Sequence, residues 1–164
     1  MSLRQDLAAE LARLNGFLAA APLSVTIADA GVELCVEFLA VDSMSCQVRR
    51  VQMTVPALAS KTAAALQAWA QNLCQRISYL LEPLGPLELD LQNQQALIRS
   101  TKPSQLPNGA QYYEILLQTG TGGVFTLQRY RTTKGTPGRD AVDMLLTHEV
   151  LLKLADDLVA SIPP

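Results

Sequence analysis

The feature of the sequence that most constrains its fold is a stripe of apolar residues that predicts one long helix. The stripe has successive spacings of four, four, three, four, four and three, through Leu58, Thr62, Leu66, Trp69, Leu73, Ile77 and Leu80. This period is typical of a helix that buries one face. Pro56 suits the first position of such a helix, where its missing N–H is not needed. The segment from Pro83 to Pro86 is expected to end it.

The opposite face of this predicted helix is polar and nearly free of charge, and it carries Gln67, Gln71 and Gln75. A polar surface without charge is easier to cover with another protein than a charged one. We therefore expect these three glutamines to lie in a protein interface, with an ordinary solvated face as the alternative.

Shorter patterns on both sides of this helix predict the remaining elements. Alternation predicts strands over 23–27, 32–38 and 46–55, the last with a bulge at Arg49–Arg50, and then over 87–91, 96–100, 111–119 and 124–131. Gln118 is expected to oppose Val124 in the last hairpin. A first helix over 3–20 would end at Pro22, and a last helix would begin at an Asp140 cap and reach about Ser161. Residues 101–110 and 132–139 are expected to form loops.

Together these elements predict a single α+β domain over residues 1–164. An antiparallel sheet, in one piece or split, would be packed by helices in the order α-β-β-β-α-β-β-β-β-α. A chain of 164 residues is of the right size for one such domain.

The composition limits the classes of function. Apolar residues make up 49% of the chain and charged residues 17%, whereas a typical domain has roughly 25% charged residues. The chain is therefore not of the disordered type. We expect part of the apolar excess to face a partner, most simply a second copy of the chain. The net charge of −2 argues against a nucleic acid as that partner.

The same composition bears on the location of the protein. No segment approaches the roughly 20 apolar residues that cross a bilayer, so we expect no membrane partner. Asp6 and Glu10 interrupt the segment where an export signal would need an apolar core. Three cysteines without CxxC spacing suit a reducing compartment, and we expect the protein to be cytoplasmic.

Residues able to carry out chemistry are few. The only histidine, His148, falls near the centre of the apolar arc of the predicted last helix. We expect it to be a core or interface residue that bonds a carbonyl or a tyrosine, with a pH-sensitive interface or a catalytic base as the alternatives. Leu152 stands where a HExxH motif would need its second histidine. We therefore expect no catalytic residues, no metal and no cofactor.

A basic segment without acids contains the candidate ligand-binding residues. They are Arg129, Tyr130, Arg131, Lys134 and Arg139, with Tyr112 on the neighbouring strand. The loop that ends at Arg139 would immediately precede the predicted last helix, and the N–H groups at a helix N-terminus favour anions. The segment is either a solvated strand end or a site for an anion or a nucleic acid.

The order of elements resembles that of the small type III secretion chaperones and their chaperone-like relatives. The elements that carry this resemblance are the Leu3–Leu18 helix, the Val25–Val55 meander, the Leu58–Leu81 helix and the Asp140–Ile162 helix, in a small acidic chain. Four strands in the second sheet segment and the 101–110 segment depart from the family pattern.

We therefore expect a non-enzymatic protein-binding module. It would be a homodimer and chaperone-like, and it would bind extended segments along a sheet edge or in an apolar groove. The alternative is a domain that binds a small ligand or an anion through the 129–139 segment.

Overall fold

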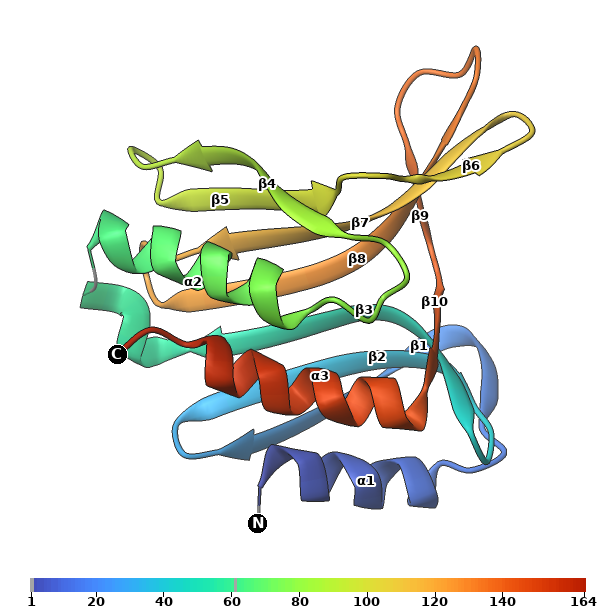
Figure 1. Cartoon of the computed structure of the whole chain (residues 1–164). Coiled ribbons are helices and arrows are strands. Elements are labelled where there is room, and N and C mark those ends of the chain that lie inside the picture. The colour runs from blue at the N-terminus through green and yellow to red at the C-terminus, as the bar shows by residue number, and fades with distance from the viewer. Residues whose placement is uncertain (1, 61) are drawn as a thin grey trace.

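The computed structural model describes residues 2–60 and 62–164. In these residues one antiparallel sheet carries all of the helices on one of its faces (Figure 1). The helices are α1 (Leu3–Arg13), α2 (Ala63–Arg76) and α3 (His148–Ser161), with a short 3₁₀ helix, η1 (Pro56–Ser60), before α2. The predicted α+β class is confirmed.

The seven longer strands form one continuous sheet in the order β1-β2-β3-β8-β7-β5-β4. Their bounds are β1 (Leu18–Asp29), β2 (Val32–Val41), β3 (Ser45–Val55), β4 (Leu84–Asp90), β5 (Gln95–Ser100), β7 (Gly109–Gln118) and β8 (Gly123–Thr133). Three short strands extend it: β6 (Ser104–Leu106) pairs with β7, β9 (Asp140–Val142) with β8, and β10 (Met144–Thr147) with β3. The predicted order of elements is therefore confirmed, with these short strands added.

The core lies between the sheet and the helix layer, because alternate residues of each strand point toward the helices. One face of the β7–β8 hairpin is buried, and it consists of Tyr113, Ile115, Leu117, Phe125 and Leu127. Gln118 opposes Val124 as predicted. The predicted bulge is also present, because Glu37 opposes Arg50 and Phe38 opposes Val48, which leaves Arg49 as the extra residue.

The first helix is shorter than predicted. α1 ends at Arg13 rather than near residue 20, and Leu18 already belongs to β1. The cause is Gly16, whose φ of 89° lies in the left-handed region that ends helices. Its N–H donates to Val41 O at 2.8 Å, so the chain joins the sheet six residues before Pro22.

The long helix predicted from the central stripe is interrupted. Pro56 starts η1 instead of an α-helix, and α2 begins only after Thr62. Leu58 packs against Gly123, where a Cβ would lie 2.6 Å from a Leu58 methyl carbon. After Arg76 the chain leaves the helix, and the Tyr79 hydroxyl donates to Asp157 of α3 at 2.7 Å. The stripe residues are nevertheless buried, apart from the exposed Thr62.

The last helix begins later than predicted, at the N-cap Thr147 instead of Asp140. The residues between them form β9 and β10, because Met144 and Leu146 alternate with exposed neighbours in the two-residue period of a strand. The Asp143 carboxylate binds Arg49 at 2.7 Å rather than capping a helix. The loop predicted over 101–110 is also wrong, since Ser104–Leu106 pairs with the start of β7 as a hairpin.

Candidate functional site

The two edges of the sheet, β1 and β4, differ in how they are protected against pairing with another strand. β4 contains Pro86, which has no N–H to donate, and a bulge at Leu87 between paired residues Pro86 and Glu88. Glu88 and Asp90 add two charges. Proline, bulges and charges are the devices by which natural sheets prevent edge pairing. The β4 edge is therefore protected.

The β1 edge has none of these devices over its second half. Residues Leu23 to Ala28 pair with β2 in unbroken register and contain neither a charge nor a proline. Among the described residues, no strand pairs with their outer side. The bulge and proline of β1 lie earlier, between Leu18 and Leu23. We call the segment Leu23–Ala28 the open edge.

Local sequence explains the register and the exposure of the open edge. Val25 and Ile27 point toward the helix layer, whereas Ser24, Thr26 and Ala28 alternate with them and are exposed. The following turn has Ala30 at φ 51° and Gly31 at φ 78°, both in the left-handed region. Two such residues form the tight hairpin turn whose twist matches that of the flanking strands. The open edge is thus held in a fixed register against β2.

The sheet face that carries no helix, here called the open face, has an uncharged centre. One row of directly paired residues crosses the whole sheet, and it consists of Thr26, Cys35, Gln52, Thr126, Leu116, Leu97 and Glu88. Only its last member, on the protected β4 edge, is charged. Some neighbouring charges on this face are paired with one another, such as Arg50 with Glu37, whereas the exposed Glu33 makes no ion pair with the described residues.

An apolar groove continues the open face beyond the start of β1. Leu18, Ala40, Gln47 and Leu145 form one row across β1, β2, β3 and β10. Leu18 is 79% exposed and Leu145 is 71% exposed, and both line a groove of about 350 Å³ with Ala40 and Gln47 between them. Leucines this exposed are unusual when they share one groove. We call this surface the corner groove.

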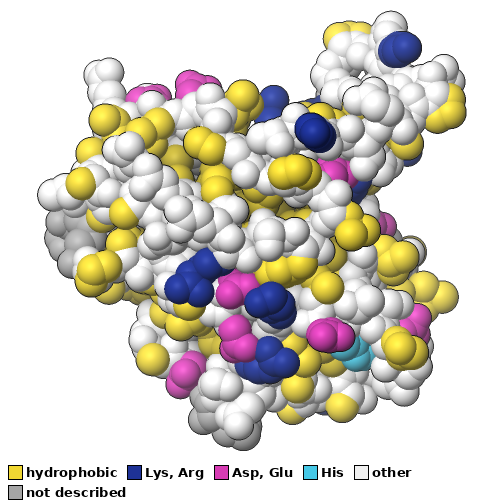
Figure 2. All heavy atoms as spheres, viewed as in Figure 1, with side chains coloured by type: hydrophobic (Ala, Val, Ile, Leu, Met, Phe, Trp, Pro, Cys, Tyr) yellow, Lys and Arg dark blue, Asp and Glu magenta, His cyan; other side chains and the backbone are white. Residues whose placement is uncertain are grey.

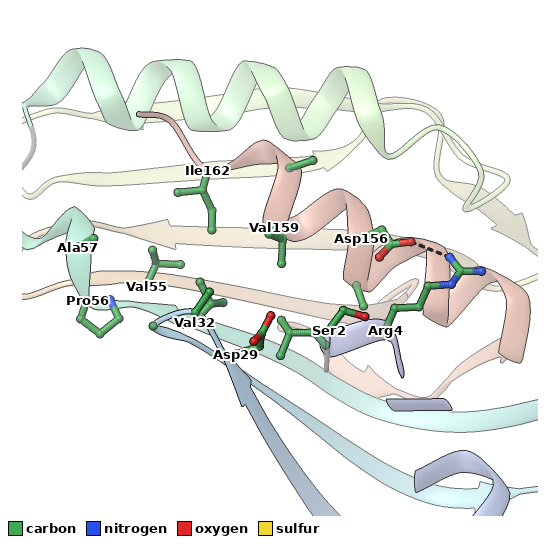
Figure 3. Close-up of a pocket in the computed structure, with 15 residues that line it drawn as sticks. Ser2, Arg4, Asp29, Val32, Val55, Pro56, Ala57, Asp156, Val159 and Ile162 are labelled. Carbon is green, nitrogen blue, oxygen red and sulfur yellow. Dashed lines mark hydrogen bonds and ion pairs between the residues drawn. The ribbon is translucent and has the colours of Figure 1, made fainter. Parts of the chain in front are cut away.

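A larger cavity, of about 670 Å³, opens between α1 and α3 (Figure 3). Val32, Val55 and Val159 line it, and it extends to Ile162 at one end. Arg4 and Asp156 lie at the other end, 2.7 Å apart in an ion pair, so neither charge is free for a ligand. Asp29 also lines the cavity and makes no ion pair with the described residues, but most of the lining is apolar.

The structure divides the predicted basic segment among three places. Arg129 points to the helix side of the sheet and donates to Glu82 at 2.7 Å. Arg139 lies on the open face and binds both carboxylate oxygens of Glu114, at 2.7 and 2.9 Å. Arg131 and Lys134 lie further out, on the strand end and the loop after it. The candidate residues therefore do not form one anion pocket.

The tyrosines of that predicted site pack around Arg139. Its guanidinium lies 3.7 Å from the centre of the Tyr130 ring, and one of its nitrogens donates to the Tyr112 hydroxyl at 3.2 Å. Arg99 also donates to Glu114, at 2.8 Å. Burial alone raises the pKa of Glu114, but the hydrogen bonds and charges of Arg139 and Arg99 hold that pKa below its ordinary value. The cluster is a closed network of paired charges.

The predicted interface residues also fall in two places. Gln67, Gln71 and Gln75 are exposed on α2, and the first two border a small apolar groove with Leu89 of β4. His148 is the first residue of α3, and its Nε2 lies 3.2 Å from Ser45 O. The predicted bond from His148 to a carbonyl is present, although the residue does not sit at the centre of a helical arc.

Sequence reasoning pointed to a sheet edge in general but did not identify β1. The sequence did contain a signal for β1 as an unprotected edge, because no charged residue occurs between Arg13 and Asp29. Glu82 was also missed as the partner of Arg129, since 47 residues separate them.

Residues 2–60 and 62–164 offer no candidate for two other kinds of site. No group of three or more His, Cys, Asp or Glu side chains is placed to hold a metal ion. None of the helices there combines the length and the apolar character that spanning a bilayer requires. Comparisons of the chain with protein families, with curated proteins and with solved structures found no match.

Proposed function

We propose that the protein is a non-enzymatic protein-binding module that forms a homodimer through the open edge of β1. The observation that carries this proposal is the contrast between the two edges of one sheet. β4 has a proline, a bulge and two charges, whereas Leu23–Ala28 has none of these. An unprotected edge exposes a row of N–H and C=O groups that another strand can bind.

A second copy of the chain is the occupant that this edge suits best. Antiparallel pairing of β1 with itself around a two-fold axis is closed and self-complementary. Because Leu23–Ala28 has no charge, such pairing places no like charges opposite each other. Leu23, which is 38% exposed, would be covered by the partner strand.

Sedimentation velocity over a range of concentrations tests the proposal with two matched variants. The double variant S24K/T26K adds two lysines at the open edge, and Q71K/Q75K adds two on the exposed face of α2. Like charges opposite each other in a sheet cost up to about 1 kcal/mol per pair, so two such pairs should make the S24K/T26K dimer dissociate up to about thirtyfold more readily. The Q71K/Q75K variant should match the wild type.

Three results would contradict the proposal. A wild-type chain that stays monomeric at every concentration excludes the dimer. Loss of the dimer in Q71K/Q75K alone places the interface on α2, as the sequence pattern suggested. The third result is a chain that stays monomeric but binds a peptide with the sequence of β1. The open edge would then be a binding site for an extended client protein, as a chaperone-like function implies. Far-UV circular dichroism checks that both variants fold.

The cysteines support a reducing compartment such as the cytoplasm as the place of action. Cys35, Cys46 and Cys74 are all unpaired. Proteins of oxidising compartments commonly pair their cysteines.

A further inference from the structure

The segment that departs most from a compact domain is a pair of joined hairpins, here called the arm. It comprises residues 101–111, which contain β6, and residues 131–141, at the end of β8 and the start of β9. The two hairpins project together from the body (Figure 1). Gly109 lies so close to the neighbouring strand that a Cβ there would be 1.8 Å from Thr132 O. Lys134 N donates to Asn108 O at 2.7 Å, which ties the two tips together.

The arm holds all of the unpaired cations in the described part of the chain. Every other described lysine and arginine has a carboxylate oxygen within 4.0 Å. The exceptions are Lys102, Arg131 and Lys134, and all three belong to the arm. Figure 2 shows the contrast on the helix side, where basic and acidic side chains alternate over α3 while a basic side chain stands alone on the projecting arm.

One carboxylate accompanies these cations. Asp140 directly opposes Arg131 in the pairing of β8 with β9, but it makes no ion pair with it. The arm therefore keeps a positive charge on a chain whose net charge is −2. An isolated positive region on a negative body attracts acidic groups of another molecule.

We propose that the arm binds an acidic segment of a partner protein in an extended conformation. β6 pairs with β7 on one side only, so its other edge is available for a partner backbone beside Lys102. Cations next to a free strand edge match a peptide that carries carboxylates along an extended chain. This site is separate from the open edge of β1, and the inference does not depend on the dimer.

The observations favour a polypeptide over a nucleic acid. Single-stranded nucleic acids need aromatic side chains on which bases stack. Tyr112 and Tyr130, at the base of the arm, are already covered by Arg99 and Arg139. Three cations would also contact only about three phosphates, against a net negative body.

Fluorescence anisotropy tests the inference with a fluorescein-labelled peptide of alternating glutamate and serine. At an ionic strength of about 0.01 M, where charges act over about 30 Å, we expect wild-type protein to bind the peptide, and at about 1 M salt the binding should disappear. The triple variant K102S/R131S/K134S should bind about tenfold more weakly, because each of three exposed charge pairs contributes a factor of about two to five. The matched control R4S/R13S/K153S loses three paired cations, and its affinity should stay within about threefold of the wild type.

Four outcomes would overturn the inference. They are the absence of peptide binding at low salt, equal binding by the arm variant, an equal loss in the control variant, and tighter binding of a labelled single-stranded oligonucleotide than of the peptide. Thermal melting of all variants checks that the losses do not come from unfolding.

Discussion

At the scale of single residues, the most consequential contact is the buried ion pair between Glu82 and Arg129. Glu82 accepts hydrogen bonds from Ser100 and Ser104 at 2.6 and 2.5 Å and from Arg129 at 2.7 Å. The guanidinium of Arg129 lies 4.3 Å from the centre of the Tyr113 ring. This network joins the segment after α2 to β5, β6 and β8, so it positions the base of the arm.

We predict that E82Q destabilises the protein by about 3 kcal/mol. Removing one charge of a buried pair leaves the other without compensation, and the second terminal nitrogen of Arg129 already has no hydrogen-bond partner. Urea denaturation measures the effect. The control E10Q removes the partner of Arg13 on the exposed side of α1 and should cost less than about 1 kcal/mol. Equal effects of the two substitutions would show that the buried pair contributes little.

Glu82 also makes the stability depend on pH. Burial alone raises the pKa of Glu82, but the hydrogen bonds from Arg129, Ser100 and Ser104 and the charge of Arg129 hold it below its ordinary value of 4.5. A carboxylate with a lowered pKa stabilises the fold above its unfolded-state pKa, and this stabilisation is lost as the pH falls through the folded-state value. The free energy of unfolding of the wild type should therefore fall below about pH 4.5 more steeply than that of E82Q. An equal pH dependence of the free energy of unfolding in the wild type and E82Q would contradict this prediction.

The three cysteines should react with iodoacetamide in a fixed order. Burial raises the pKa of Cys46 to about 12 and also raises the pKa of Cys74. Cys35 is partly exposed in the central row of the open face. Because the thiolate is the reactive form, we expect Cys35 to be modified first and Cys46 last in native protein at pH 8, as followed by mass spectrometry. Protection of Cys35 comparable to that of Cys46 would mean that the open face is covered.

At the scale of elements, the sequence predicted those features that are set by residues close together in the chain. The register of the β7–β8 hairpin and the bulge at Arg49 follow from alternation within one or two strands, and both predictions are confirmed. The extent of the helices was less predictable. Leu18 continues the stripe of α1 in sequence, yet the backbone of Gly16 has already turned into the sheet.

Contacts with residues distant in sequence determine the remaining differences between the predicted and the observed elements. Asp140 and Asp143 look like a helix cap from sequence, but Arg49 binds the second of them across 94 residues. Prolines and Asn108 suggested a loop over 101–110, whereas pairing with β7 makes a hairpin of it. Distant partners also separate the residues of the basic segment. Arg129 binds Glu82 and Arg139 binds Glu114, and both carboxylates lie outside the segment.

The joining of the two hairpins predicts a strong effect of G109A. The added methyl group would collide with the Thr132 carbonyl, so the arm must separate or distort, at a cost of about 2 to 4 kcal/mol. The control G120A meets only the flexible end of Gln94, at 3.3 Å, and should cost less than about 1 kcal/mol. Thermal denaturation compares the two. A G109A protein as stable as G120A would contradict the close packing of the arm.

At the scale of the whole molecule, the three helices stand on one face of the sheet and leave the other face without a helix layer (Figure 1). Antiparallel sheets tolerate such one-sided packing when the second face is polar. Here the open face has a central row that is uncharged except for Glu88 on β4, and a corner groove with two exposed leucines, and one edge of the sheet is unprotected. These features share one side of the fold, and they are the reason for assigning its function to contacts with protein.

Hydrogen exchange of the β1 amides, measured at two protein concentrations, tests pairing through the open edge most directly. If a second copy binds there, amides within Leu23–Ala28 that point outward should exchange more slowly at the concentration where the chain is dimeric. The same amides in S24K/T26K should exchange at the fast rate at both concentrations. Unchanged exchange in Leu23–Ala28, with new protection on α2 or elsewhere, would contradict the account.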